Sequence, residues 1–136
     1  MNEQEKKIVR LLLNEMAFEG ALRHFNEPSP NVPVGLYAEL QQIGVPGRYD
    51  GSRETYVFED LGYDENKSPF ENCYIGLRRI RNNIIHANKA FKPDPPERLA
   101  NLLSWADKFI TVVYATNASF AARATEIKVA LRVTSF

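Results

Sequence analysis

A run of basic and amide side chains between residues 78 and 89 is the part of the sequence best suited to chemistry. Its members are Arg78, Arg79, Arg81, Asn82, His86 and Lys89. Arginine is permanently cationic and binds phosphate oxygens through a planar pair of donors, whereas histidine exchanges a proton near neutral pH. These types suit cleavage of RNA, which needs a base for the 2′-hydroxyl, an acid for the leaving 5′-oxygen and positive charge on the transition state. That scheme requires no metal ion, and we expect no cofactor.

The charge of the chain is divided between its halves. Lys plus Arg equals Asp plus Glu at 17 each, so the net charge is zero. Residues 1–71 hold 7 basic and 13 acidic side chains, a balance of −6, and residues 72–136 hold 10 and 4, a balance of +6. Residues 72–93 contain no acid. An anionic ligand such as RNA is therefore expected at this segment, despite the neutral total.

Length and composition limit the class of protein. A chain of 136 residues is expected to form one domain, residues 1–136. The single cysteine, Cys73, excludes an internal disulfide and a Cys-x-x-Cys pair. The polar N-terminus is unlike a signal peptide, and no apolar run has the length of a membrane span. We expect a cytoplasmic protein with no membrane association.

Two helices are expected in the first half. Asn2 can cap a helix that runs to about Asn26, with Glu5 placed for a capping box. Its apolar residues recur at helical intervals and are Ile8, Leu11, Leu12, Met16, Phe18, Leu22 and Phe25. Prolines from residue 28 onward end it. A shorter helix is expected over residues 34–43, ended by Gly44.

Proline-containing caps mark two further long helices. Ser68, Pro69 and Glu71 predict one start, and Asp94 before a doubled proline predicts another. The apolar stripe of the first helix is Phe70, Cys73, Leu77, Ile80, Ile84, Ala87 and Phe91, and that of the second is Leu99, Leu102, Leu103, Ala106, Phe109, Ile110 and Val113. The short loop between them predicts antiparallel neighbours, and hence an up-and-down helical bundle.

The sequence pattern does not settle the secondary structure of two segments. Residues 45–67 form a long loop in which residues 56–58 could make one short strand, although nothing in the sequence obviously pairs with it. Residues 117–136 fit a helix through Phe120, Ala124 and Ile127, and fit a strand through the alternation of residues 127–133. The expected fold class is therefore all-α, with a C-terminal segment that is either helix or strand.

The segment Arg81-Asn82-Asn83-Ile84-Ile85-His86 resembles the signature of the HEPN superfamily, an arginine and a histidine separated by four to six residues, with a polar residue after the arginine. As architecture, the resemblance covers roughly residues 1–27 and 69–116. HEPN domains are small helical bundles, and many are metal-independent endoribonucleases, hydrolases of toxin–antitoxin, antiphage or RNA-processing systems. Others bind nucleotides without cutting.

The resemblance implies a role for each member of the segment. Arg81 would neutralise the scissile phosphate, His86 would act as acid or base, and Asn82 would hold the phosphate or the imidazole. Arg78, Arg79 and Lys89 are the candidate phosphate contacts. Products would carry 2′,3′-cyclic phosphate and 5′-hydroxyl ends. A bacterial toxin or defence component is implied, with a nucleotidyltransferase-type antitoxin as a possible partner.

Helix geometry predicts that the site is shared between two chains. Arg81 and His86 lie roughly 140° apart around an ideal helix, so one helix does not present both on one face. HEPN nucleases typically dimerise so that two such helices meet, and Ile85, which projects outside the core stripe, would then lie in the dimer interface. Arg79, seven residues before His86, also has the spacing of the motif.

The main alternative is a non-catalytic HEPN-like module that binds a nucleotide or a protein. A zinc- or calcium-dependent hydrolase is a third hypothesis, to which the sequence lends little support, because its two histidines and its loop acids lack ligand spacing. Several residues are interpreted as structural or as low-ranking ligands: His24, the loop acids Glu59, Asp60, Asp64 and Glu65, the loop tyrosines 49, 56 and 63, and the core aromatics Trp105, Phe109, Tyr114 and Phe120.

Overall fold

The computed structural model describes residues 2–23, 30–46, 58–59, 62–86 and 96–130. Within these ranges the chain forms the helices α1 (Glu3–Arg23), α2 (Val34–Ile43), α3 (Pro69–His86), α4 (Pro96–Thr116) and α5 (Ala118–Ala130), and the two-residue strands β1 (Val45–Pro46) and β2 (Phe58–Glu59). The expected all-α bundle is confirmed.

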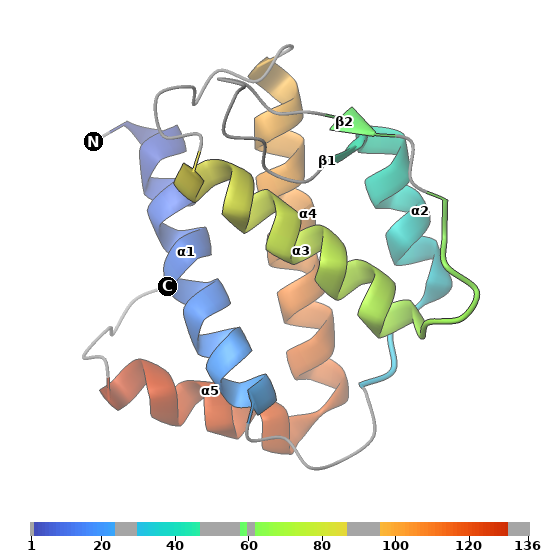
Figure 1. Ribbon diagram of the computed structural model, residues 1–136. Helices are drawn as coiled ribbons and strands as arrows, with labels where there is room; N and C mark the ends of the chain where they lie inside the picture. Colours follow the sequence, from blue (N-terminus) through green and yellow to red (C-terminus); the bar gives the residue numbers. More distant parts are fainter. Residues whose placement is uncertain (1, 24–29, 47–57, 60–61, 87–95, 131–136) are drawn as a thin grey trace.

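The helices are not arranged in a strict up-and-down order. In Figure 1, α1 and α4 run downward side by side, and α2 and α3 both run upward, with α3 crossing obliquely. Helix α5 lies across the lower ends of α1 and α4 and packs on both. The long connection between α2 and α3 allows these two helices to share a direction, whereas α3 and α4 run in opposite overall senses, with α3 crossing α4 obliquely.

The predicted caps form where the sequence placed them. The Asn2 Oδ1 accepts a hydrogen bond from the Glu5 N–H at 2.8 Å, and the Ser68 Oγ accepts one from the Glu71 N–H at 3.1 Å. Gly44 ends α2 with a φ of 112°, a conformation that favours glycine. The boundaries of α2 agree with the prediction, and the predicted end of the first helix near Asn26 lies outside the described residues.

The two undecided segments are resolved in part. Residues 118–130 are helical, and Asn117 caps this helix through a 3.1 Å bond from the Phe120 N–H to its Oδ1. Phe120 and Ala124 are buried while Ala122 between them is exposed, and Val129 is 69% exposed, so the burial follows the helical period and not the strand alternation. Strand β2 pairs antiparallel with β1, so a short strand at residue 58 has a partner that sequence analysis missed.

The core is built around Phe18 of α1. Its ring lies between 5.0 and 6.2 Å, centroid to centroid, from five aromatic rings: Phe70, Tyr74, Phe109, Tyr114 and Phe120. Trp105 stacks on Phe109 and donates from its indole N–H to the Leu36 carbonyl at 2.8 Å. The expectation that the late aromatics are core residues is confirmed. Burial of these rings joins α1, α3, α4 and α5 at one centre, and the Trp105 hydrogen bond ties α2 to it.

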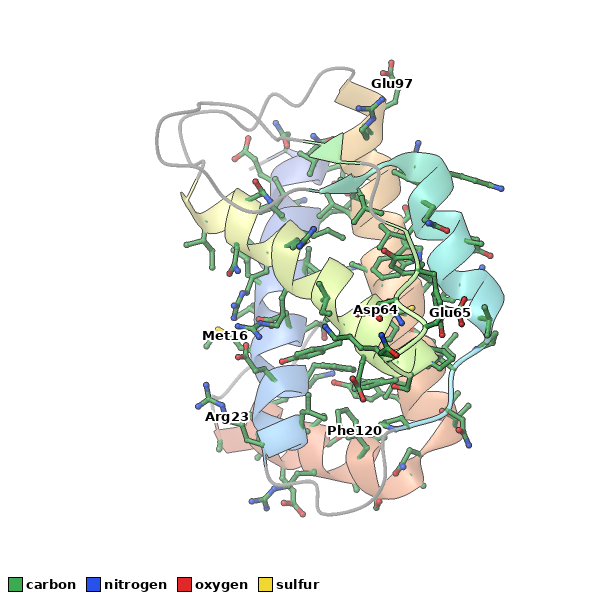
Figure 2. All side chains as sticks on the ribbon, turned by 45° about the vertical axis from the view of Figure 1, so that its right-hand side comes forward. Met16, Arg23, Asp64, Glu65, Glu97 and Phe120 are labelled. Atoms are coloured by element: carbon green, nitrogen blue, oxygen red, sulfur yellow. The ribbon has the colours of Figure 1, made fainter. Side chains whose placement is uncertain are left out.

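One residue of the predicted α1 stripe faces the wrong way. Met16 is 51% exposed, and Figure 2 shows it pointing away from the neighbouring helices. It lies about 160° around the helix from Phe18, the centre of the buried face, so its apolar type alone was misleading. None of the helices in the described ranges is long and apolar enough to cross a membrane.

Candidate functional site

Helix α3 presents the basic segment with one face fixed in the core. Phe70, Cys73, Leu77, Ile80 and Ile84 are all at most 3% exposed, which confirms the apolar stripe over the described part of the helix. Ala87 and Phe91, its last two members, lie outside the described residues. With this face buried, the rotation of α3 is set, so that Arg81 lies beside α1 and Arg78 lies at the surface.

Arg81 is held at the seam between α1 and α3. Its Nη1 donates to Glu19 Oε2 at 2.7 Å and to Glu15 Oε2 at 3.4 Å. Its Nε and Nη2 donate to the Asn82 Oδ1 at 3.1 and 2.9 Å. A guanidinium has five N–H groups, so these contacts leave one Nη2 N–H without an acceptor among the described residues. The Arg81 side chain is 20% exposed, so part of it remains at the surface.

Glu15 is the least expected member of this site. The residue is fully buried, and its Oε1 has no hydrogen-bond partner in the described structure. Burial raises the pKa of its carboxyl from an ordinary value of 4.5 to about 7; a hydrogen bond with Glu19 raises it too, and the charge of Arg81 opposes the shift. The charge beside Arg81 therefore changes near neutral pH. A protonated Glu15 leaves Arg81 opposed by Glu19 alone.

Tyr74 and Arg78 extend the site along α3. The Arg78 guanidinium carbon lies 5.9 Å from the centre of the Tyr74 ring, a cation–π distance, and Arg78 is otherwise exposed. Burial raises the pKa of the Tyr74 hydroxyl, and the charges of Glu19 and Glu15 add to that shift. Arg78 is therefore positioned as a surface cation one helical turn from Arg81.

Asn82 and Asn83 serve different purposes. The Asn82 Oδ1 is occupied by Arg81, so Asn82 orients the arginine, and its Nδ2 makes no bond within the described chain. Asn83 is 1% exposed and donates from Nδ2 to the Arg79 carbonyl at 2.8 Å. Arg79 is partly buried and has an interaction of its own. Of the two amides, Asn82 is the one near the surface.

The remaining predicted residues are only partly placed. Ile85 is 48% exposed, as its position outside the core stripe predicted. His86 is the last residue of α3, and its side chain lies outside the described part of the structure, as does all of Lys89. The structure thus brings together Arg81, Asn82 and Arg78, and leaves the distance from Arg81 to the imidazole undefined.

The lower-ranked candidates are structural where they are described. Asp64 accepts from the Asn66 N–H at 2.9 Å and lies 3.7 Å from the Lys67 ammonium, which closes the turn before α3. Tyr63 packs edge-on against Tyr37, with centroids 5.6 Å apart. His24, Tyr49, Tyr56 and Asp60 fall outside the described residues, as does the Glu59 side chain. Over the described ranges, no group of three or more His, Cys, Asp or Glu residues is arranged to hold a metal ion.

No known protein family, curated protein or solved structure matches this chain.

Sequence reasoning missed the two acids that hold Arg81. Neither Glu15 nor Glu19 was singled out among the polar residues of the first helix. A signal for both was present, because residues 15 and 19 are one helical turn apart and residue 15 falls within the arc of Ile8, Leu11 and Leu22. An acid inside an apolar arc requires a buried partner, and the acid-free α3 supplies it.

Proposed function

We propose that the chain is a metal-independent endoribonuclease of HEPN type that acts as a homodimer. The observation that carries this proposal is the placement of Arg81, whose guanidinium is fixed by Asn82, Glu15 and Glu19 while the side chain remains 20% exposed. A fixed and partly exposed guanidinium is suited to a phosphate, because the arginine need not be ordered when the ligand binds.

The division of labour follows from these contacts. Arg81 stabilises the charge that develops on the scissile phosphate, and the free Nδ2 of Asn82 donates to a phosphate oxygen beside it. Arg78, exposed one turn away, attracts the neighbouring phosphate. His86 exchanges the proton, activating the 2′-hydroxyl or protonating the 5′-oxygen. The products carry 2′,3′-cyclic phosphate and 5′-hydroxyl ends.

Dimerisation is proposed through the surface beside the Arg81–Glu19 ion pair. Ile85 on α3 lies about 40° outward from Arg81, and Met16 on α1 lies about 60° outward from Glu19. Both are about half exposed, at 48% and 51%. Because α1 and α3 are in contact, these apolar side chains flank the ion pair on the outer side of the seam. A second copy that covers them would bring its own basic segment next to this one.

The dimer is tested with a matched pair of charge insertions. Ile85→Glu is expected to convert a dimer to a monomer in light scattering and to abolish RNA cleavage. Val129→Glu, at a position 69% exposed on α5, is expected to change neither. A monomeric wild-type chain with full activity would refute the shared site, and so would an unchanged dimer in Ile85→Glu.

Cleavage is tested by incubating the purified chain with RNA in excess EDTA and analysing the product ends. Wild type is expected to yield cyclic phosphate ends, and His86→Ala to lose activity by a factor of about 100 or more. Arg81→Lys retains the charge but not the planar donor set, so it is expected to lose a similar factor. RNA that stays intact with the wild-type dimer refutes the nuclease proposal.

A non-catalytic binding module is the second candidate, and one observation favours it. Four of the five N–H groups of Arg81 are already used within the chain, and two carboxyls oppose its charge. This hypothesis expects RNA or nucleotide binding without cleavage, and the same binding in His86→Ala. RNA that wild type binds and leaves intact, with equal binding by His86→Ala, would decide for it.

The biological setting is proposed from the charge division. A toxin or defence component held by an antitoxin of nucleotidyltransferase type fits a chain whose first half is acidic and second half is basic. Co-expression with the product of the neighbouring gene, followed by purification of a complex that no longer cleaves RNA, is the test. A neighbouring product that neither binds nor inhibits would count against this setting.

A further inference from the structure

A cavity of about 120 Å³ lies between α1 and α4, on a different side of α1 from the Arg81 seam. Eight residues line it: Lys7, Arg10, Leu11 and Asn14 from α1, and Leu103, Ser104, Asp107 and Ile110 from α4. The three apolar members are buried and form its floor, and the charged members are exposed and form its rim. An apolar floor with a few polar groups at the edge is the usual composition of a small-molecule site.

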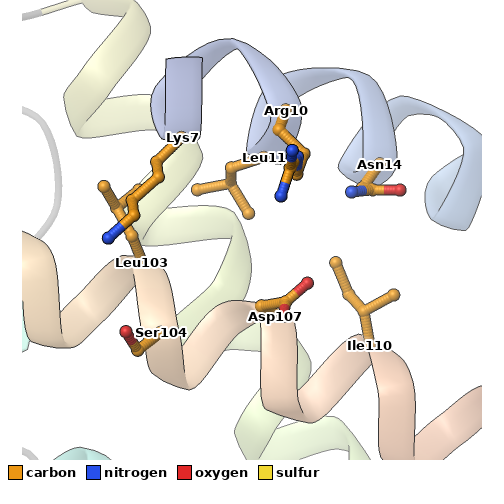
Figure 3. Close-up of a pocket in the computed structure, with 8 residues that line it drawn as sticks. All are labelled: Lys7, Arg10, Leu11, Asn14, Leu103, Ser104, Asp107 and Ile110. Carbon is orange, nitrogen blue, oxygen red and sulfur yellow. The ribbon is translucent and has the colours of Figure 1, made fainter. Parts of the chain in front are cut away.

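Asn14 shows that this cavity is more than a packing defect. It is 8% exposed, and its carboxamide makes no hydrogen bond within the described part of the chain. Figure 3 places it beside Ile110 at one end of the cavity. The polar atoms of this carboxamide are not among the fully enclosed ones, so in the free chain water reaches them from the cavity. A ligand that supplies both a donor and an acceptor would replace that water.

The rim carries charges of both signs that do not neutralise each other. Figure 3 shows the Arg10 guanidinium and the Asp107 carboxylate facing one another across the opening, and Lys7 reaching from α1 toward Leu103 and Ser104. Within the described residues, neither cation forms an ion pair with Asp107. Charges of opposite sign separated by an open space are suited to a ligand that also carries both signs.

We propose that this cavity binds a small zwitterion of amino-acid type with an aliphatic side chain. The carboxylate of the ligand lies between Lys7 and Arg10, and its ammonium group donates to Asp107 and to the side-chain Oδ1 of Asn14. The aliphatic group of the ligand packs on the apolar floor. Asp107 excludes a simple anion, because it repels a ligand that lacks a positive group. The volume is too small for a nucleotide, since pockets for drug-sized ligands measure roughly 300 Å³ or more, and leucine would fill it with the aliphatic group alone, its charged groups lying at the exposed rim.

The test uses L-leucine as the probe, with 4-methylpentanoate, which lacks the ammonium group, and inorganic phosphate as comparisons. Calorimetry and amide NMR shifts measure binding to the full chain. Wild type is expected to bind leucine more tightly than either comparison, with the largest shifts at residues 7–14 and 103–110. Asp107→Asn is expected to weaken leucine binding about tenfold, and to leave the affinity for 4-methylpentanoate unchanged or to raise it. Glu97→Gln, an exposed neutralisation on the same helix, serves as the matched control and is expected to change neither.

Three results would overturn the proposal. One is the absence of any leucine-induced shift at about 10 mM, a concentration at which even a weak site would be occupied. Another is a leucine affinity that Asp107→Asn leaves unchanged. The third is phosphate binding as tight as leucine binding, which would make the cavity a simple anion site. Because Asp107 is at the surface, its variant is expected to fold, and none of these results depends on RNA cleavage.

Discussion

Replacing Glu15 by glutamine tests the buried centre of the Arg81 site. The folded chain encloses this carboxyl completely, and its pKa rises to about 7. Glutamine has almost the same shape, its carbonyl can accept from Arg81, and its amide N–H can donate to Glu19 as the protonated carboxyl does. Glu15→Gln therefore removes the ionised form and keeps the contacts. Arg81 retains its 2.7 Å bond to Glu19.

The size of the effect follows from the pKa. The carboxyl has a higher pKa in the folded chain, about 7, than its ordinary 4.5, so the folded state binds a proton more tightly than the unfolded state. The resulting loss of stability is absent below pH 4.5, grows as pH rises, and is complete above about pH 7. A shift of this size corresponds to about 3 kcal/mol. Wild type is expected to lose most of this free energy of unfolding as the pH rises from about 5 to about 8.

Urea unfolding near those two pH values, followed by circular dichroism, measures the prediction. Glu15→Gln is expected to be more stable than wild type at the higher pH by about 2 to 3 kcal/mol, and nearly equal at the lower. Glu3→Gln, an exposed site on the same helix, controls for the general effect of charge. An unchanged pH dependence in Glu15→Gln would refute the reasoning, and so would a loss of stability at the higher pH.

Three further substitutions test local packing by the same unfolding assay, and an unchanged midpoint would contradict each. Asn72→Ala removes a buried carboxamide that contacts four backbone groups before α3: the N–H and carbonyl of Asp64 and the carbonyls of Lys67 and Ser68. Its loss should lower the free energy of unfolding by about 2 to 4 kcal/mol. Gly76→Ala places a Cβ in collision with the Leu40 Cδ2, so a loss of about 1 to 3 kcal/mol is expected, with partial rescue by Leu40→Val. Trp105→Phe removes the indole hydrogen bond to the Leu36 carbonyl and should cost about 0.5 to 1.5 kcal/mol.

Much of the fold could be predicted because local signals act within one helix. The caps at Asn2 and Ser68 and the stop at Gly44 depend on residues within three or four positions, and all three formed as expected. Met16 was placed on the wrong face because its apolar type suggested burial, and only its angle relative to Phe18 decides exposure. The β1–β2 pair was missed because strands of two residues leave no periodic pattern.

The candidate site was predictable only along α3. Arg81, Asn82 and Ile85 could be placed relative to one another by helix geometry, and the outward position of Ile85 is confirmed. The partners of Arg81 come from a helix more than sixty residues away in the chain, at separations of 66 and 62. No spacing rule along a sequence connects residues that far apart, since their contact depends on how two helices pack.

The amino-acid sequence by itself determined the helices of this protein, their inward faces and the acid-free segment that carries Arg81 and His86. Tertiary structure alone decided that Glu15 and Glu19 meet Arg81, that Asn14 lies unpartnered at a cavity, and that α2 and α3 share a direction. The physical reason is the range of the forces involved. Capping and periodicity act within a few residues, whereas burial of a carboxyl or an amide depends on which distant surface excludes water from it.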